Sequence, residues 1–153
     1  MKVLQLILSA GGLLLASHAF AQTKTINPAD FHGTVATKKM YRAVYQLNSD
    51  DDKVIKGTLR NIMNALDDPR LKGKLEVELV AHSGGVTVFK KDKPYEAQLK
   101  ALQARGVILA ECENTIRERN ISKDELFDFI SYVPSGNGEI IILQQQGWAM
   151  VHP

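Results

Sequence analysis

The feature that most constrains the fold is a series of short apolar runs separated by segments with helical periodicity. Four such runs occupy residues 40–47, 75–81, 107–110 and 139–145, and most are apolar at consecutive positions. A strand that is apolar on both faces must be covered on both faces, which is typical of parallel sheets packed between helices. The sequence therefore predicts an α/β domain of the three-layer α/β/α type, with a mainly parallel sheet of about five strands.

The segments between these runs carry helix signals. Residues 49–52, Ser-Asp-Asp-Asp, supply an N-cap and an acidic first turn, and apolar residues then recur at helical spacing. A second helix is expected from about residue 95 to Gly106, and a third from the capping box at 122–125 to about residue 130. Residues 86–89 are interpreted as either a short strand or part of a loop.

The N-terminus resembles a secretory signal peptide. Lys2 is followed by a mostly apolar core at residues 3–16, and Ala19-Phe20-Ala21 matches the small-x-small cleavage pattern. The core is shorter than the roughly 20 residues that a membrane-spanning helix needs, and no cysteine near the cleavage site could carry a lipid. We expect cleavage after Ala21 and export, to the bacterial periplasm, with no membrane span afterwards. The alternative is an uncleaved anchor.

Removal of residues 1–21 leaves 132 of the 153 residues, enough for one domain with a proper core. Residues 22–39 are polar and lack periodicity, so we interpret them as an N-terminal arm. Residues 40–153 then form the single folded domain.

Composition and missing motifs exclude several function classes. The 19 Lys and Arg residues nearly balance the 17 Asp and Glu residues without a clustered basic face, which argues against a nucleic-acid partner. The chain has no glycine-rich nucleotide motif, no Cys-x-x-Cys and no Gly-x-Ser-x-Gly. The sequence spacing of Cys112 from His82, His32 and His152 does not match a metal-ligand motif, which argues against a metal site. We predict no cofactor and no metal.

The single cysteine is the strongest chemical signal. Exported domains usually carry cysteines in pairs, but Cys112 has no partner in its own chain. It is therefore an inert buried residue, a link to another molecule, or a reactive thiol. Cys112 lies between the run 107–110 and a predicted helix at 113–119, where unpaired N–H groups favour a thiolate. The neighbouring Glu111 and Glu113 oppose one. We predict an accessible thiol with a lowered pKa.

Parallel strands also bring their carboxyl ends to one edge of the sheet, where α/β proteins bind ligands. Unusual residues follow the predicted strands at that edge, namely Asn48, His82, Gly84, Gly85, Cys112, Asn114 and Trp148. Each has a simpler explanation as well: the asparagines as turn or cap residues, His82 as a satisfied loop histidine, the glycines as a flexible turn, and Trp148 as a core or interface residue.

Residues 105–116, Arg-Gly-Val-Ile-Leu-Ala-Glu-Cys-Glu-Asn-Thr-Ile, resemble the cysteine motif of the DsrE/DsrF-like family. Three other stretches, 44–48, 80–86 and 132–149, also resemble sequences of this family and occur in the same order as in its members. The resemblance therefore covers roughly 40–153. It implies a three-layer fold with a parallel five-stranded sheet, a homo-oligomer, and a persulfide carried on Cys112 during sulfur relay. His82 and Asn48 match family positions at the same edge. The characterised sulfur relays of this family act in the cytoplasm, whereas this sequence carries an export signal.

The resulting prediction is an exported sulfur-carrier or sulfurtransferase-like protein, whose partner is a small sulfur compound or a sulfur donor or acceptor protein. The alternative is a non-catalytic module that binds a small ligand between Asn48, His82, Cys112 and Trp148, or a structural oligomer of the same fold. In either case the apolar tail after Trp148 is expected to form a subunit contact.

Overall fold

The computed structural model describes residues 27–153, so the predicted signal peptide lies outside the described residues. The chain divides into two units, residues 1–34 and 35–153. In the described part of the first unit, η1 (Pro28–Asp30) is one turn of 3-10 helix, and Asn27 Oδ1 accepts a hydrogen bond from the Ala29 N–H at 3.2 Å. The predicted boundaries of the N-terminal arm remain a prediction.

The second unit is built on a five-stranded sheet in which every pair of neighbouring strands is parallel. The strand order is β4-β3-β2-β1-β5. The strands are β1 (Tyr41–Leu47), β2 (Leu75–Ala81), β3 (Ile108–Cys112), β4 (Ser131–Val133) and β5 (Ala149–Val151). This confirms the predicted parallel α/β fold, and the apolar runs at 40–47, 75–81 and 107–110 account for its three central strands.

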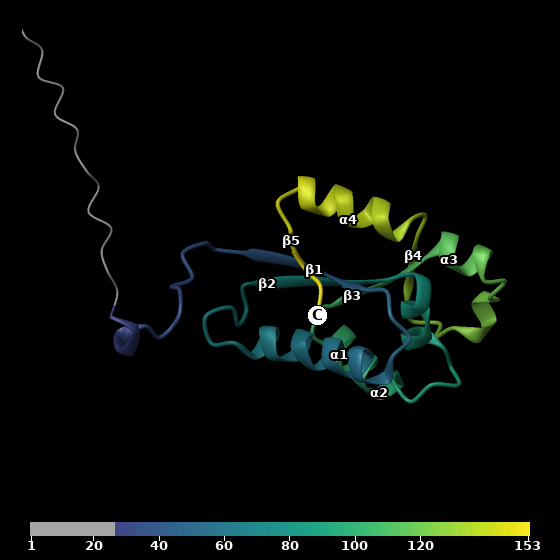
Figure 1. The fold of residues 1–153 in the computed structure, drawn as a ribbon, viewed down its shortest axis with the longest axis horizontal. Coiled ribbons are helices and arrows are strands. Elements are labelled where there is room, and N and C mark those ends of the chain that lie inside the picture. Colours follow the sequence, from purple (N-terminus) through teal and green to yellow (C-terminus); the bar gives the residue numbers. More distant parts are fainter. Residues whose placement is uncertain (1–26) are drawn as a thin grey trace, which may run out of the picture. The chain divides into compact units, whose positions relative to one another are not determined.

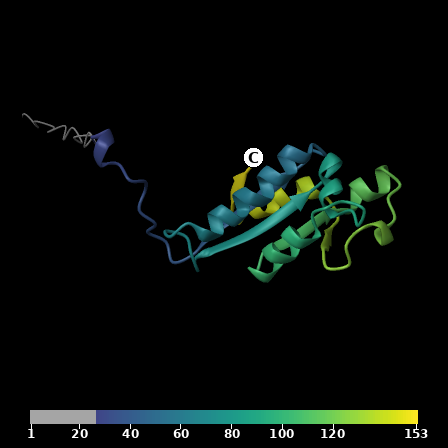
Figure 2. The same ribbon diagram turned by 90° about the horizontal axis from the view of Figure 1, so that it is seen from below.

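Helices cover both faces of this sheet (Figure 1). The helices α1 (Asp52–Asp67) and α2 (Glu96–Ala104) pack on one face and contact each other. Both lie on the near side of the sheet in the view from below (Figure 2). Helix α4 (Gly136–Gln145) packs on the other face. The short elements η2 (Ser83–Phe89), α3 (Glu113–Glu118) and η3 (Lys123–Glu125) connect strands near one end of the sheet. No helix within residues 27–153 is long and apolar enough to cross a membrane.

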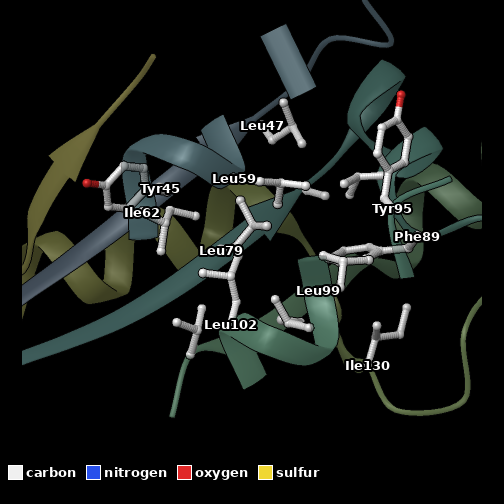
Figure 3. Close-up of a cluster of buried hydrophobic side chains, with 14 of the residues drawn as sticks. Tyr45, Leu47, Leu59, Ile62, Leu79, Phe89, Tyr95, Leu99, Leu102 and Ile130 are labelled. Carbon is white, nitrogen blue, oxygen red and sulfur yellow. The ribbon is translucent and has the colours of Figure 1, made fainter. Parts of the chain in front are cut away.

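The larger hydrophobic core lies between the sheet and the pair α1 and α2 (Figure 3). Leu59 and Ile62 of α1 meet Leu79 of β2 and Leu99 of α2 there, and all four are buried. A smaller core forms on the opposite face, where α4 packs on the central strands through Val44, Val80, Ala110, Ile140 and Leu143. Alternate residues of each central strand therefore face different layers, which explains why these strands are apolar on both sides.

The predicted strand at 139–145 is wrong, because these residues belong to helix α4. Ser135 caps the helix by accepting a hydrogen bond from the Gly138 N–H at 3.2 Å. Ile140 and Leu143 are buried, whereas Ile141 and Ile142 are exposed, so burial along the apolar run follows helical spacing. A short apolar run does not by itself distinguish a strand from a helix.

The predicted helix from 122 to about 130 is also wrong beyond its first turn. The capping box forms, with Glu125 Oε1 accepting from the Ser122 N–H at 2.8 Å, but it holds only the 3-10 turn η3. The chain then runs extended beside η2, and the Phe127 N–H donates to the Phe89 carbonyl oxygen at 3.0 Å. Residues 86–89, whose pattern fits a strand or a loop, form part of the 3-10 helix η2.

Candidate functional site at the carboxyl edge of the sheet

Cys112 is the last residue of β3 and the N-cap of α3, as its sequence position predicts. Ala81 pairs with Glu111 in the sheet register, so His82, the residue after β2, lies beside Cys112. Ala110 faces α4, and Cys112, two residues further along the same strand, faces the same side. The thiol therefore meets the N-terminus of α4 at the carboxyl edge of the sheet.

N–H and hydroxyl groups of three residues lie close enough to Cys112 to influence its pKa. Burial raises the pKa of the thiol, but the backbone N–H groups of Gly136, Thr115 and Asn114 and the Thr115 hydroxyl lower it by more. The pKa of Cys112 therefore lies below its ordinary value, in the direction that the sequence predicts. N–H and hydroxyl groups close to an acid favour its charged form, although the Cys112 side chain makes no capping hydrogen bond to α3 in this conformation.

The side chain of Cys112 is nevertheless almost covered. Its exposed fraction is 5%, which differs from the accessible thiol expected from the sequence. Gly136 packs closely against it, since a Cβ on Gly136 would lie 3.3 Å from the Cβ of Cys112 and 3.1 Å from the Cβ of His82. A reagent that reaches the sulfur in this conformation must be small.

His82 is held from both sides of its ring. The Gln46 side-chain amide lies 2.8 Å from Nε2, and Nδ1 lies 3.1 Å from Ser83 Oγ. Both ring nitrogens are therefore engaged in hydrogen bonds. Burial lowers the pKa of His82, and the nearby His152 lowers it further. His82 is thus neutral at pH 7 and does not supply a positive charge to the thiolate.

Thr115 joins the two halves of the site. Its Oγ1 accepts a hydrogen bond from the Ser83 N–H at 2.8 Å, which ties the end of β2 to α3. Ser83 has a φ of 52°, in the left-handed region that non-glycine residues seldom adopt. Thr115, Gln46 and Gly136 were missed as site residues because their role depends on tertiary contacts. The available signals were the Asn114-Thr115 pair after the cysteine and Gly136, which lies within the family-like stretch 132–149.

Two acidic neighbours were expected to oppose the thiolate. Glu111 points to the face opposite Cys112, its exposed fraction is 0%, and neither carboxyl oxygen has a hydrogen-bond partner among residues 27–153. Burial, and next the charge of Cys112, raises the pKa of Glu111 to about 9. Glu111 is therefore protonated at neutral pH and adds no negative charge. Glu113 forms an ion pair with Lys123 at 2.7 Å, which offsets its charge.

The two glycines of the predicted site have a packing role. A Cβ on Gly85 would collide with the carbonyl oxygen of Leu47, and a Cβ on Gly84 would lie 2.9 Å from the Asp50 nitrogen. Both glycines let η2 press against the turn that follows β1. Both glycines are buried, and their small size allows η2 to pack closely at the carboxyl edge of the sheet.

The remaining predicted residues are not brought together. Asn48 is exposed after β1, and the Asn114 side chain accepts a hydrogen bond from Arg117 at 2.6 Å, so only its backbone N–H serves Cys112. Trp148 precedes β5 and therefore lies at the amino-terminal edge of the sheet, packed against the smaller core. Its predicted place beside Cys112 is wrong, because it depended on a strand at 139–145. Within residues 27–153, no three His, Cys, Asp or Glu side chains form a group that could hold a metal ion.

Comparisons with known proteins agree with this fold. The profile of the DsrE/DsrF-like family matches residues 39–153. A protein of unknown function, MTH1491 from Methanobacterium thermoautotrophicum, has 32% identity and a TM-score of 0.69, and the match covers 74% of this chain and 99% of that one. No curated protein matches the chain.

Two further solved structures show similarity of fold alone. The ychN protein from E. coli has 18% identity and a TM-score of 0.56, over 76% of this chain and 100% of that one. The BT1422 protein from Bacteroides thetaiotaomicron has 10% identity and a TM-score of 0.58, over 73% of this chain and 94% of that one.

Proposed function

Because this chain belongs to the DsrE/DsrF-like family, which is associated with sulfur relay, we propose that Cys112 holds a sulfane sulfur as a persulfide and passes it on. The protein would then be a sulfur carrier or sulfurtransferase-like protein. The observation that carries the proposal is the set of N–H and hydroxyl donors around the Cys112 sulfur, from Gly136, Asn114 and Thr115. Donors placed in this way stabilise the negative charge of a thiolate or of a persulfide anion.

The loading step needs no cofactor. The Cys112 thiolate attacks the outer sulfur of a donor persulfide R–S–SH, a new S–S bond forms, and the S–S bond of the donor breaks. The bonding electron pair leaves with the donor as RS⁻, so Cys112 becomes Cys–S–SH with atoms and charge balanced. Transfer to an acceptor thiolate is the same reaction in reverse. Both ring nitrogens of His82 are engaged by Gln46 and Ser83, so His82 serves in this proposal as a wall of the site.

The location and assembly of the protein complete the proposal. The signal-like residues 1–21 support export to the periplasm. N-terminal sequencing of the mature protein should then give Gln22 as its first residue. A homo-oligomer is supported by exposed apolar side chains on the α4 side of the sheet, where Ile141 is 60% exposed and Ile142 is 52% exposed. Met150 and Ile108 are exposed as well.

The alternative, a small-ligand-binding module, has less support. Two surface cavities have volumes of about 420 and 250 Å³, and neither is lined by Cys112 or His82. The first lies at Phe127 and Phe129, and the second lies between α1 and α2.

Mass spectrometry of the intact native protein tests the sulfur-carrier function. Incubation with a polysulfide should add about 32 Da, the mass of one sulfur atom, and dithiothreitol should remove it. The Cys112→Ser variant, matched in size, should gain nothing. The His82→Ala variant should still load, because the neutral imidazole is not required to form the thiolate. A native protein that takes up no sulfur, with a thiol that reacts only after denaturation, would identify Cys112 as an inert core residue.

A further inference from the structure

Glu78 places a carboxyl group in the layer between the sheet and α4. It lies two residues before Val80 in β2, so its side chain faces α4 as that of Val80 does, and its exposed fraction is 5%. Its neighbours in the sheet register, Val44 and Ile108, are apolar. Burial of an unpaired charge is costly, so this layer favours the protonated carboxyl group. The packing of α4 therefore depends on the proton that Glu78 holds.

The charged groups near Glu78 do not offset its burial. Glu139 is the only charged residue of α4, and it adds negative charge. On the same face of the neighbouring strands, Arg42 of β1 pairs with Glu76 of β2 at 2.8 Å, and β3 presents apolar residues beside Glu78. In the part of the chain that the structure describes, no cation pairs with Glu78. Burial, and next the charge of Glu139, raises the pKa of Glu78 from 4.5 to about 7.

The first turn of α4, residues 136–139, joins this charge to the candidate site. Glu139 lies about one helical turn after Gly136, which packs against the side chain of Cys112. Gly136 and Gly138 are weak helix formers. The order of this turn therefore depends on its contacts with the sheet more than on helix propensity.

We propose that Glu78 is a positioning residue, which lets the first turn of α4 pack on Cys112 while it is uncharged and loosens that turn when it ionises. Cys112 is 5% exposed while the turn is packed, so a sulfur donor reaches the thiol more readily once the turn has loosened. This inference rests on the proposed function and adds to it the control of access to the thiol by pH.

The direction of the effect follows from the proton on Glu78. While α4 is packed, Glu78 keeps a proton that a carboxyl group in water releases near pH 4.5. The packed arrangement therefore has its full stability below pH 4.5, and it loses stability as the pH rises to about 7. The difference between 4.5 and about 7 sets an upper limit of about 300-fold on the change in the opening equilibrium.

Alkylation of Cys112 by iodoacetamide, followed through intact mass at pH 5.5 and 7.5, measures access to the thiol. Glu78→Gln keeps the shape of the side chain and removes its charge. Glu76→Gln is the matched control, because Glu76 lies on the same face of β2, is exposed and pairs with Arg42. Cys112 is present in all three proteins, so its own ionisation cancels in the comparison. Loading from a polysulfide is measured on the same proteins.

We expect the alkylation rate of the wild-type protein to rise between the two pH values by about fivefold to 20-fold more than that of Glu78→Gln. Glu76→Gln should follow the wild-type protein. Amide hydrogen exchange of α4, compared between the wild-type protein and Glu78→Gln at each pH, should show the same widening difference. A residue that only fills space would change stability without changing this pH profile.

Equal pH dependence of alkylation in the wild-type protein and Glu78→Gln would overturn the inference, and loading from the polysulfide would still support the proposed function. If Glu78→Gln does not fold, hydrogen exchange in the wild-type protein decides, because protection of α4 must then fall more than that of α1 between pH 5.5 and 7.5. A wild-type thiol that reacts only after denaturation at both pH values would refute the proposed function and this inference together.

Discussion

The ionisation of Glu111 should weaken the fold as the pH rises. The carboxyl group lies in the middle layer of the domain, with no exposed surface and, in the part of the chain that the structure describes, no hydrogen-bond partner for either oxygen. Burial is the main reason that its pKa rises from 4.5 to about 9, and the charge of Cys112 adds to it. The folded protein therefore keeps a proton on Glu111 that the unfolded chain releases near pH 4.5.

The sign and size of the effect follow from this difference. Below pH 4.5 the group is protonated in both states and has no effect on stability. Between pH 4.5 and about 9 the unfolded chain binds fewer protons, so the free energy of unfolding falls by about 1.4 kcal/mol for each pH unit. Above about pH 9 the loss is complete. Cys112 acts in the opposite direction, because its pKa is lowered in the folded state.

The perturbation is Glu111→Gln, and the measurement is urea unfolding at pH 7.5 and 8.5. Glu78→Gln is the matched control. Burial, and next the charge of Glu139, raises the Glu78 pKa to about 7, so Glu78 contributes little slope above that pH. Both variants retain Cys112, and its contribution cancels in the comparison. Because Glu111 begins to ionise near pH 8.5 and Glu78 keeps a small slope, we expect the Glu78→Gln protein to lose about 1 kcal/mol more than the Glu111→Gln protein between the two pH values.

Equal slopes in the two variants would refute the reasoning, because they would mean that Glu111 is ionised or solvated in the folded protein. The amide that Glu111→Gln introduces brings unpartnered donors, which lower stability at every pH and leave the slope unchanged. The slope, and not the absolute stability, is therefore the decisive quantity.

Three further predictions concern the scaffold. Asp51→Ala should lower the free energy of unfolding by about 1 kcal/mol in urea titrations, because the Asp51 carboxylate caps α1 by accepting two backbone N–H groups at 2.8 and 3.0 Å; an unchanged midpoint would contradict this. Phe89→Ala should cost about 3–5 kcal/mol because Phe89 is fully buried, whereas Val35→Ala at an exposed position should change stability by less than about 0.5 kcal/mol. Light scattering at micromolar concentration should show a homo-oligomer that Ile141→Glu weakens, and a monomeric wild-type protein would argue against that contact.

Local sequence signals predicted the centre of the fold. Runs that are apolar on both faces marked β1, β2 and β3, because a buried strand needs apolar side chains in both directions. Gly106, with a φ of 83°, ends the helix before β3 as its residue type suggests. The same signals placed Cys112 where a strand meets a helix and so indicated a lowered thiol pKa.

The edges of the sheet and the details of the site depended on tertiary structure. The apolar residues of 139–145 fit either a strand or a helix. The Ser135 cap favours the helix α4, and the edge of β1 pairs instead with the three residues of β5. Because these residues form a helix, Trp148 lies at the amino-terminal edge of the sheet and Gly136 packs against the Cys112 side chain. Neighbouring charges in the sequence suggested that Glu111 opposes a thiolate, but its burial keeps it neutral. A pKa depends on solvation and on contacts across the fold, which residue order alone does not specify.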